Sequence, residues 1–180
     1  TMNDRNALRK RLEQDKIEFI LVQFVDVHGA AKGKMVPVSC LDDALDVGAG
    51  FAGAAMWGIG QGPHGHDVMA RIDLATCTPL AWMPNTARFA SNLFVDNQPH
   101  PFCSRTNLQR VLNEAKSKGY VFNVGMEPEH FLVTRNCDGS IRPWDPVGVD
   151  TLTKPCYDYR SMSAAMGYLQ DVTTALNQLG

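Results

Sequence analysis

The stretch Phe19–Lys34, which reads FILVQFVDVHGAAKGK, decides the fold of the N-terminal part of the chain. An apolar run over residues 17–25 is rich in β-branched and aromatic residues, which favours a strand. Residues 26–29 predict a turn, because Gly29 can adopt a positive φ without steric cost. A second strand at about residues 31–38 then completes a β-hairpin.

Further helices and strands are expected on both sides of this hairpin. Before it, Leu8 and Leu12 lie one turn apart in a basic segment, which predicts an amphipathic helix. After it, residues 68–72 and 87–95 are rich in apolar residues and predict two more strands. The first hundred residues therefore predict a small mixed sheet with one or two helices.

A punctuated segment, Asn97-Gln-Pro-His-Pro101, separates these elements from the rest of the chain. Beyond it the sequence predicts three regular elements: a helix over residues 104–119, a strand over residues 120–133 and a last helix over residues 160–179. This order indicates a second α+β unit. The predicted fold class is therefore α+β, with one domain over residues 1–101 and the beginning of another over residues 102–180.

The composition excludes several classes of protein. Of the 180 residues, 44% are hydrophobic and 20% are charged, which is typical of a globular chain and not of a disordered one. The formal net charge is −2, so nucleic acid is not an expected partner, and the apolar runs are too short to span a membrane. The five cysteines stand singly, which predicts reduced thiols in the cytoplasm and argues against a zinc site or a thiol nucleophile.

The region from residue 48 to residue 65 carries seven glycines. A segment of this kind inside a compact domain is usually a binding loop or a mobile loop.

The strongest chemical signal is the segment GMEPEHFLV at residues 125–133. On a strand, Glu127 and Glu129 would point to the same face, about 7 Å apart. Two carboxylates in an apolar strand are costly to bury unless a cation lies beside them, and Mg²⁺ or Mn²⁺ accepts such oxygen ligands. The alternative is an edge strand whose glutamates are solvated or paired with Lys or Arg.

Five segments, taken in order, resemble the glutamine synthetase family. The glutamate segment is similar to the family's metal-binding strand, and Phe19–Lys34 is similar to the first hairpin of its small N-terminal β-grasp domain. Three further segments follow in the family's order: Gly50–Ala55 (GFAGAA), His66–Asp73 (HDVMARID) and Lys154–Asp158 (KPCYD). A different carboxylate–metal enzyme with a similar strand would not explain this ordered set.

The resemblance implies an ATP-dependent ligase that phosphorylates the γ-carboxylate of glutamate and then lets an amine displace the phosphate. It implies that Glu129 holds the divalent metal near glutamate and the amine, and that Glu127 holds the metal near the ATP phosphates. It also implies that Tyr157 lines the substrate pocket. Paired cations suit this chemistry, because the transferring phosphoryl group carries spread negative charge.

One departure from the family pattern bears on the substrate. Glutamine synthetases carry Phe-Asp-Gly-Ser-Ser in the glycine-rich loop, where the Asp binds ammonium. Here the loop reads Phe51-Ala-Gly-Ala-Ala55, so Ala52 replaces that carboxylate. The loop resembles the branch of γ-glutamylmethylamide synthetases, which favours methylamine as the substrate and leaves glutamine synthetase as the alternative. Asp67 could take part in deprotonating the amine, or could only cap the start of a strand.

The resemblance also implies a homo-oligomeric ring in which the small domain of one subunit closes the active site of its neighbour. The family needs further metal ligands, a nucleotide pocket and arginines beyond position 180. We therefore expect the chain to be an N-terminal piece of a longer enzyme and to be inactive alone. A non-catalytic assembly or regulatory module is the remaining alternative.

Overall fold

The computed structural model describes residues 2–149 and 151–179. The chain divides into two compact units between residues 122 and 123. Helices and strands occur in both units, so the predicted mixture of α and β structure is confirmed.

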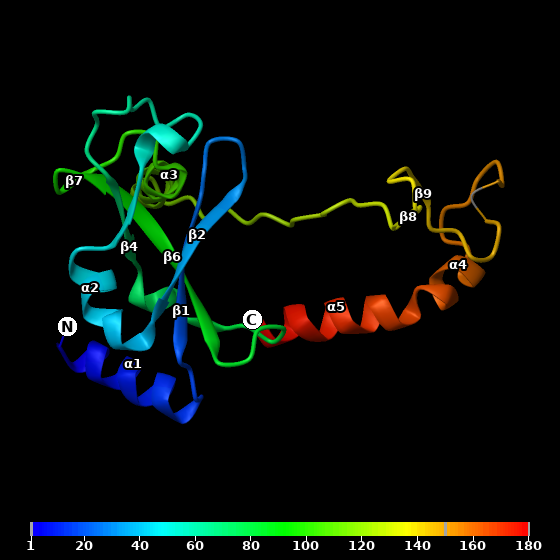
Figure 1. Ribbon diagram of the computed structural model, residues 1–180, viewed down its shortest axis with the longest axis horizontal. Coiled ribbons are helices and arrows are strands. Elements are labelled where there is room, and N and C mark those ends of the chain that lie inside the picture. The colour runs from blue at the N-terminus through cyan, green and yellow to red at the C-terminus, as the bar shows by residue number, and fades with distance from the viewer. Residues whose placement is uncertain (1, 150, 180) are drawn as a thin grey trace. The chain divides into compact units, whose positions relative to one another are not determined.

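The first unit is built on a mixed sheet with the strand order β2-β1-β6-β4-β3, while β5 and β7 pair with the ends of β6 (Figure 1). β1 runs parallel to β6, and the other neighbouring strands are antiparallel. The strands are β1 (Phe19–Val25), β2 (Ala31–Pro37), β3 (Ala49–Phe51), β4 (Val68–Ile72), β5 (Thr78–Pro79), β6 (Thr86–Val95) and β7 (Gln98–Pro99). The strands predicted at residues 17–25, 31–38, 68–72 and 87–95 are therefore confirmed within two residues at each end.

Apolar side chains from the helices and from one face of the sheet form the core. The helices of this unit are α1 (Met2–Gln14), α2 (Leu41–Asp46) and α3 (Ser104–Ser117), with short 3₁₀ turns η1 (Val38–Cys40), η2 (Gly53–Ala55) and η3 (Leu74–Thr76). Leu8 and Leu12 of α1 are buried as predicted, and they belong to one cluster with Val22 of β1, Leu41 of α2 and Phe89 of β6. Burial of these side chains is the main force that holds α1 and α2 on the sheet.

The β1–β2 hairpin forms as predicted, with Phe19 opposite Pro37 and Val25 opposite Ala31. Asp26 organises its turn, because one carboxylate oxygen accepts hydrogen bonds from the backbone N–H groups of His28 and Ala30, both at 2.9 Å. Gly29 has φ +79°, a conformation that residues with a side chain rarely adopt.

The second unit contains β8 (Val133–Arg135), β9 (Ile141–Pro143), α4 (Tyr159–Ala164) and α5 (Met166–Leu179). β8 and β9 form a two-stranded antiparallel hairpin. The single helix predicted over residues 160–179 is wrong in detail, because it is interrupted at Ala165. The backbone there leaves the helical region, although Ala165 and Leu169 still donate to the carbonyls four residues before them.

The strand predicted over residues 120–133 is also wrong: residues 121–132 form no regular element, and β8 starts only at Val133. A strand requires a neighbour that accepts and donates its backbone hydrogen bonds. No described strand pairs with residues 121–131, and Leu132 accepts a backbone hydrogen bond of 2.9 Å from Trp144 just beyond the β8–β9 hairpin. The apolar side chains of this segment are accordingly exposed, including Val121 at 84% and Phe131 at 93%.

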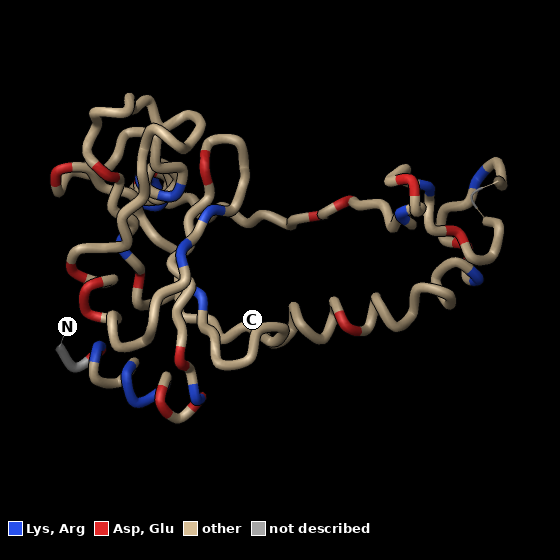
Figure 2. Tube along the Cα trace, viewed as in Figure 1, with Lys and Arg blue, Asp and Glu red and all other residues tan. Residues whose placement is uncertain are grey.

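Two expectations about the chain as a whole can be compared with the structure. Acidic and basic residues both occur along the two units, in keeping with the formal net charge of −2 (Figure 2). Over residues 2–149 and 151–179, none of the helices combines the length and the apolar character that a membrane span needs.

Candidate functional site

The glycine-rich loop joins β3 to β4, and its two ends lie side by side. In the antiparallel ladder of these strands, Phe51 is opposite Val68. Continuing this register by one residue places Ala52 opposite Asp67 where the loop leaves the sheet. Both residues are exposed. The structure therefore brings together the two residues that the sequence analysis assigned to amine binding and amine deprotonation.

The carboxylate of Asp67 lies beside β3. A Cβ atom added to Gly50 would be 3.4 Å from Oδ2 of Asp67, which is ordinary contact distance. None of the hydrogen bonds between described residues involves this carboxylate. Asp67 thus presents an exposed acceptor beside Ala52.

The neighbouring His66 ties this end of the loop to the turn between β6 and β7. Its ring nitrogen Nδ1 is 2.5 Å from Oδ1 of Asp96. This hydrogen bond, followed by the charge of Asp96, raises the pKa of His66 above its ordinary value. The contact is exposed, so we attribute to it the orientation of the loop end and little stability.

Lys34 of β2 connects the hairpin to the start of the loop. Its ammonium group donates a hydrogen bond to the backbone carbonyl of Gly50 and lies 5.1 Å from the centre of the Phe51 ring. The ring of Phe51 also meets Phe24 of β1 edge to face, with centroids 5.1 Å apart. These contacts fix the residue before Ala52. Sequence reasoning did not assign Lys34 this role, because nothing in the local pattern shows that its side chain reaches Gly50.

Gln61 is a second residue that sequence reasoning missed. Its side-chain oxygen Oε1 is buried and has no hydrogen-bond partner among the described residues. A Cβ atom added to Gly53 would lie 1.6 Å from this oxygen, so the absence of a side chain at Gly53 makes room for the Gln61 amide. The glycine-rich composition was a signal for such close contacts, but it did not identify the partner.

The turn of the first hairpin supports the middle of the loop. A Cβ atom added to Gly58, which has φ +74°, would lie 2.1 Å from Cγ2 of Val27. His28 and Trp57 have ring centroids 6.1 Å apart. The hairpin and the glycine-rich loop, two segments distant in sequence, therefore pack against each other.

The two glutamates of the predicted metal site lie in the second unit, on the segment that forms no strand. Glu127 and Glu129 are both exposed, and the hydrogen bonds and ion pairs between described residues include neither carboxylate. The side-chain alternation that would place them on one face is therefore not imposed by a sheet. Their assignment as metal ligands remains a prediction.

The donor chemistry of these two residues nevertheless fits a hard divalent cation. Carboxylate oxygens are the ligands that Mg²⁺ and Mn²⁺ prefer, and such cations usually take about six. Among the described residues there is no group of three or more His, Cys, Asp or Glu side chains that could hold a metal ion. The chain therefore offers two candidate ligands and requires others to complete a site.

His130, between Glu129 and Phe131, is held by α5. The hydroxyl group of Tyr168 is 2.7 Å from Nε2 of His130, and their ring centroids are 5.6 Å apart. This contact lies within the second unit. It gives the segment with the glutamates one fixed attachment point.

Tyr157 also belongs to the second unit and has an unusual backbone. Its φ is +64°, in the left-handed region that is unfavourable for a residue with a large side chain, and the side chain is fully exposed. Asp158 follows it and caps α4 by accepting a hydrogen bond of 2.9 Å from the N–H group of Arg160. A strained, exposed aromatic residue beside a fixed helix start is consistent with a role in binding.

Comparison with known proteins identifies the family of the chain. Residues 101–180 match the model described as glutamine synthetase, catalytic domain. Over 170 residues the chain is 39% identical to glutamate–methylamine ligase of Methyloversatilis universalis, covering 94% of this chain. It is 30% identical over 164 residues to glutamine synthetase of Rhizobium leguminosarum bv. phaseoli, covering 91% of this chain. The chain belongs to the glutamine synthetase family.

A solved structure of this family also resembles the fold. The match to a GmaS/ADP complex has a TM-score of 0.80 and 29% sequence identity, and it covers 96% of this chain and 39% of that one. The chain spans 38% of the length of the Methyloversatilis ligase and 36% of the Rhizobium enzyme. The glutamine synthetase catalytic-domain match contains Glu127, Glu129 and Tyr157, whereas Ala52 and Asp67 precede it.

Proposed function

We propose that the protein containing this chain is an ATP-dependent ligase that joins a small amine to the γ-carboxylate of glutamate through γ-glutamyl phosphate. Methylamine is the favoured amine, and the product is then γ-glutamylmethylamide. The observation that carries this proposal is the 39% identity to a glutamate–methylamine ligase over 94% of the chain. Because the chain spans 38% of that relative, the activity is proposed for the longer protein and not for residues 1–180 alone.

The choice of methylamine rests on Ala52. An acidic residue here would pair with ammonium, whereas the methyl side chain of Ala52 removes that charge and leaves space for the carbon of an alkylamine. Asp67, which precedes β4 where Ala52 follows β3, retains one exposed carboxylate at the same end of the strand pair. We assign to Asp67 the acceptance of a proton from the amine as it attacks.

Glu127 and Glu129 are proposed to hold Mg²⁺ or Mn²⁺, together with ligands from the rest of the protein. Bound there, the cations would neutralise the charge of the transferring phosphoryl group of ATP. Tyr157 is proposed to line the glutamate pocket. One structural relative is a GmaS/ADP complex, which supports the use of a nucleotide.

We further propose a homo-oligomeric ring with active sites between subunits, and a cytoplasmic enzyme. The N-terminal domain is proposed to be β-grasp-like over residues 1–101, with the catalytic domain beginning at residue 102. The start of the family match at residue 101 supports this boundary, although the compact units of the chain divide later, between residues 122 and 123.

The test is the amine preference of the full-length enzyme in a phosphate-release assay with glutamate and ATP. We expect a higher kcat/KM for methylamine than for ammonium, and mass spectrometry should identify γ-glutamylmethylamide. A higher kcat/KM for ammonium would instead favour the second candidate, a glutamine synthetase, which the 30% identity to the Rhizobium enzyme supports. Failure to release phosphate with any amine would favour a non-catalytic assembly or regulatory module.

A further inference from the structure

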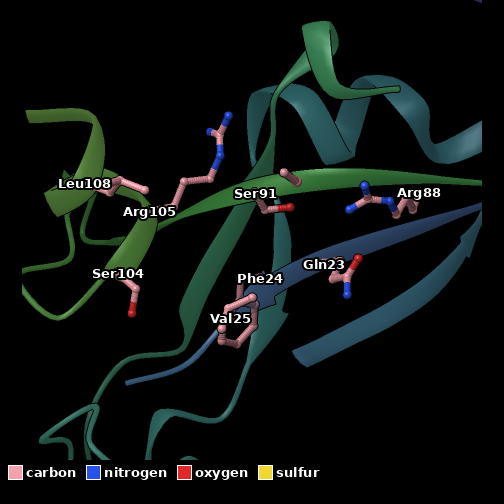
Figure 3. A pocket seen from close by; sticks show the side chains of 9 residues that line it. Gln23, Phe24, Val25, Arg88, Ser91, Ser104, Arg105 and Leu108 are labelled. Carbon is pink, nitrogen blue, oxygen red and sulfur yellow. The ribbon is translucent and has the colours of Figure 1, made fainter. Parts of the chain in front are cut away.

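A cavity of ≈ 370 Å³ lies within the first unit, where β1 and β6 run side by side and α3 begins (Figure 3). This volume falls in the range of sites that bind small organic molecules, about 300–1,000 Å³. The cavity contains none of the residues to which the sequence analysis assigned a role. It therefore needs an explanation of its own.

The charge of the cavity comes from Arg88 of β6. Arg105 of α3 also lines it, but the guanidinium group of Arg105 is 2.7 Å from Oδ2 of Asp73 and 2.7 Å from Oδ1 of Asn92. By contrast, Arg88 has no side-chain hydrogen bond or ion pair within the part of the chain that the structure describes. No Asp or Glu lines the cavity. An uncompensated positive charge in a concave site favours an anion.

The other walls are mostly apolar. Val25 of β1, Ala90 of β6 and Leu108 of α3 supply carbon surface. Leu108 is 58% exposed, although α3 places it over the sheet. A ligand with a carbon skeleton would cover this surface, whereas a bare inorganic anion would not.

A polar side chain of the lining can orient such a ligand. Gln23 of β1 carries an amide that can donate as well as accept. Ser91 of β6 also borders the cavity, but its hydroxyl oxygen is buried and is not available to a ligand there.

We propose that this cavity binds a small organic anion. The acidic group of the ligand pairs with Arg88, and its carbon skeleton lies against Val25, Ala90 and Leu108. A carboxylate suits the planar guanidinium group of Arg88, which can donate two parallel hydrogen bonds to it. This inference does not depend on which amine the enzyme uses.

The first experiment uses the full-length protein and two probes of the same shape, hexanoate and the neutral hexanamide, in isothermal titration calorimetry. We expect one hexanoate per subunit, and an affinity for hexanamide at least tenfold lower, because charge-assisted hydrogen bonds are about twice as strong as neutral ones. Inorganic phosphate should bind to the cavity with a lower affinity than hexanoate, because it has no carbon skeleton to cover the apolar walls. Equal affinities for hexanoate and hexanamide, or the absence of hexanoate binding, would overturn the proposal.

The second experiment locates the site. Arg88→Gln should weaken hexanoate binding at least tenfold, whereas Arg110→Gln, which removes an exposed arginine of α3 outside the cavity, should leave it unchanged. If Arg88→Gln lowers Tm, Arg88→Lys keeps the charge and should retain partial binding. Hexanoate binding that is equal in all three variants would place the probe elsewhere. A crystal structure of the full-length protein with its own chain filling the cavity would also contradict the proposal.

Discussion

The ammonium group of Lys34 lies 5.1 Å from the centre of the Phe51 ring and binds the carbonyl oxygen of Gly50. These two contacts join β2 to the residue before Ala52, across sixteen residues of sequence. Because the proposed amine site begins at Ala52, its position depends on a side chain from the first hairpin.

Replacing Lys34 should therefore weaken amine binding while leaving the fold intact. For Lys34→Met in the full-length enzyme, we expect KM for methylamine to rise about three- to tenfold, since one exposed cation–π contact contributes about 0.5–1 kcal/mol and the hydrogen bond adds to it. KM for ATP should change less. Lys34→Arg, which keeps the charge over the ring, is the matched control, and an unchanged KM for methylamine in Lys34→Met would refute this role.

Restoring a carboxylate at position 52 should shift the substrate preference. Ala52→Asp is expected to lower the ratio of kcat/KM for methylamine to kcat/KM for ammonium at least tenfold, because the new charge attracts ammonium and occupies the space for the methyl group. Ala54→Asp adds the same charge at an exposed position of the same loop and should change the ratio little. The measurement is phosphate release with each amine in turn.

Glu129 and Glu127 provide a test of the metal prediction. Glu129→Gln should raise the Mg²⁺ concentration for half-maximal activity of the full-length enzyme at least tenfold, because a neutral amide oxygen is a weaker ligand than a carboxylate. Glu127→Gln should do the same and should also raise KM for ATP. Glu18→Gln, an exposed glutamate of the first unit, is the control. If both variants show the same Mg²⁺ dependence as the control, the assignment of Glu127 and Glu129 as metal ligands is wrong.

The close contact between Gly53 and Gln61 predicts a stability effect. Gly53→Ala should reduce the free energy of unfolding by about 1 kcal/mol, because the new Cβ atom displaces the Gln61 amide from its buried position. The effect should vanish in a Gln61→Ala background. Gly62→Ala is the matched control, since a Cβ atom there meets nothing within 4 Å. Thermal unfolding should show a Tm decrease of about 2–4 °C for Gly53→Ala alone.

Asp26 predicts how the stability of the hairpin depends on pH. The backbone N–H group of Ala30, with that of His28 and the charge of Lys32, lowers the pKa of Asp26 below its ordinary value despite burial. A carboxyl group whose pKa is lowered in the folded state stabilises the fold above the unfolded pKa of about 3.9, and this contribution is lost as the pH falls through the lower folded value.

Asp26→Asn should therefore lower Tm at pH 7 and flatten the decrease in Tm between pH 5 and pH 2. Asp171→Asn, which changes an exposed carboxylate of α5, should leave the pH dependence as in the wild-type chain. Melting curves recorded by circular dichroism across this pH range provide the comparison. Parallel curves for the wild type and Asp26→Asn would contradict the assignment.

Local patterns were sufficient to predict most elements of the first unit. Each of these patterns acts over a few residues, and each produced the expected element. They are the alternation and the β-branched side chains of residues 17–25, the turn at Gly29, and the spacing of Leu8 and Leu12. The motifs, taken in order, also indicated the family, and the comparisons confirmed the family.

The segment with Glu127 and Glu129 shows where local patterns are insufficient. Its composition favours a strand, but a strand also needs backbone partners, and no described segment provides them. The contacts around Ala52 are a second example, because local patterns did not predict contacts that the structure contains. Lys34, Asp67 and Gln61 meet the loop only because β2, β3 and β4 belong to one folded unit.

The sequence by itself thus determined the family, the first hairpin and the chemical types of the candidate site residues, because these depend on residue order and short-range periodicity. Only the tertiary structure decided that Ala52 and Asp67 lie at the same end of the β3–β4 pair, that Lys34 holds Phe51, and that Arg88 lines a cavity without a side-chain partner among the described residues. Those relationships join residues far apart in the chain. They arise from the pairing of strands and the burial of apolar faces, which no local pattern records.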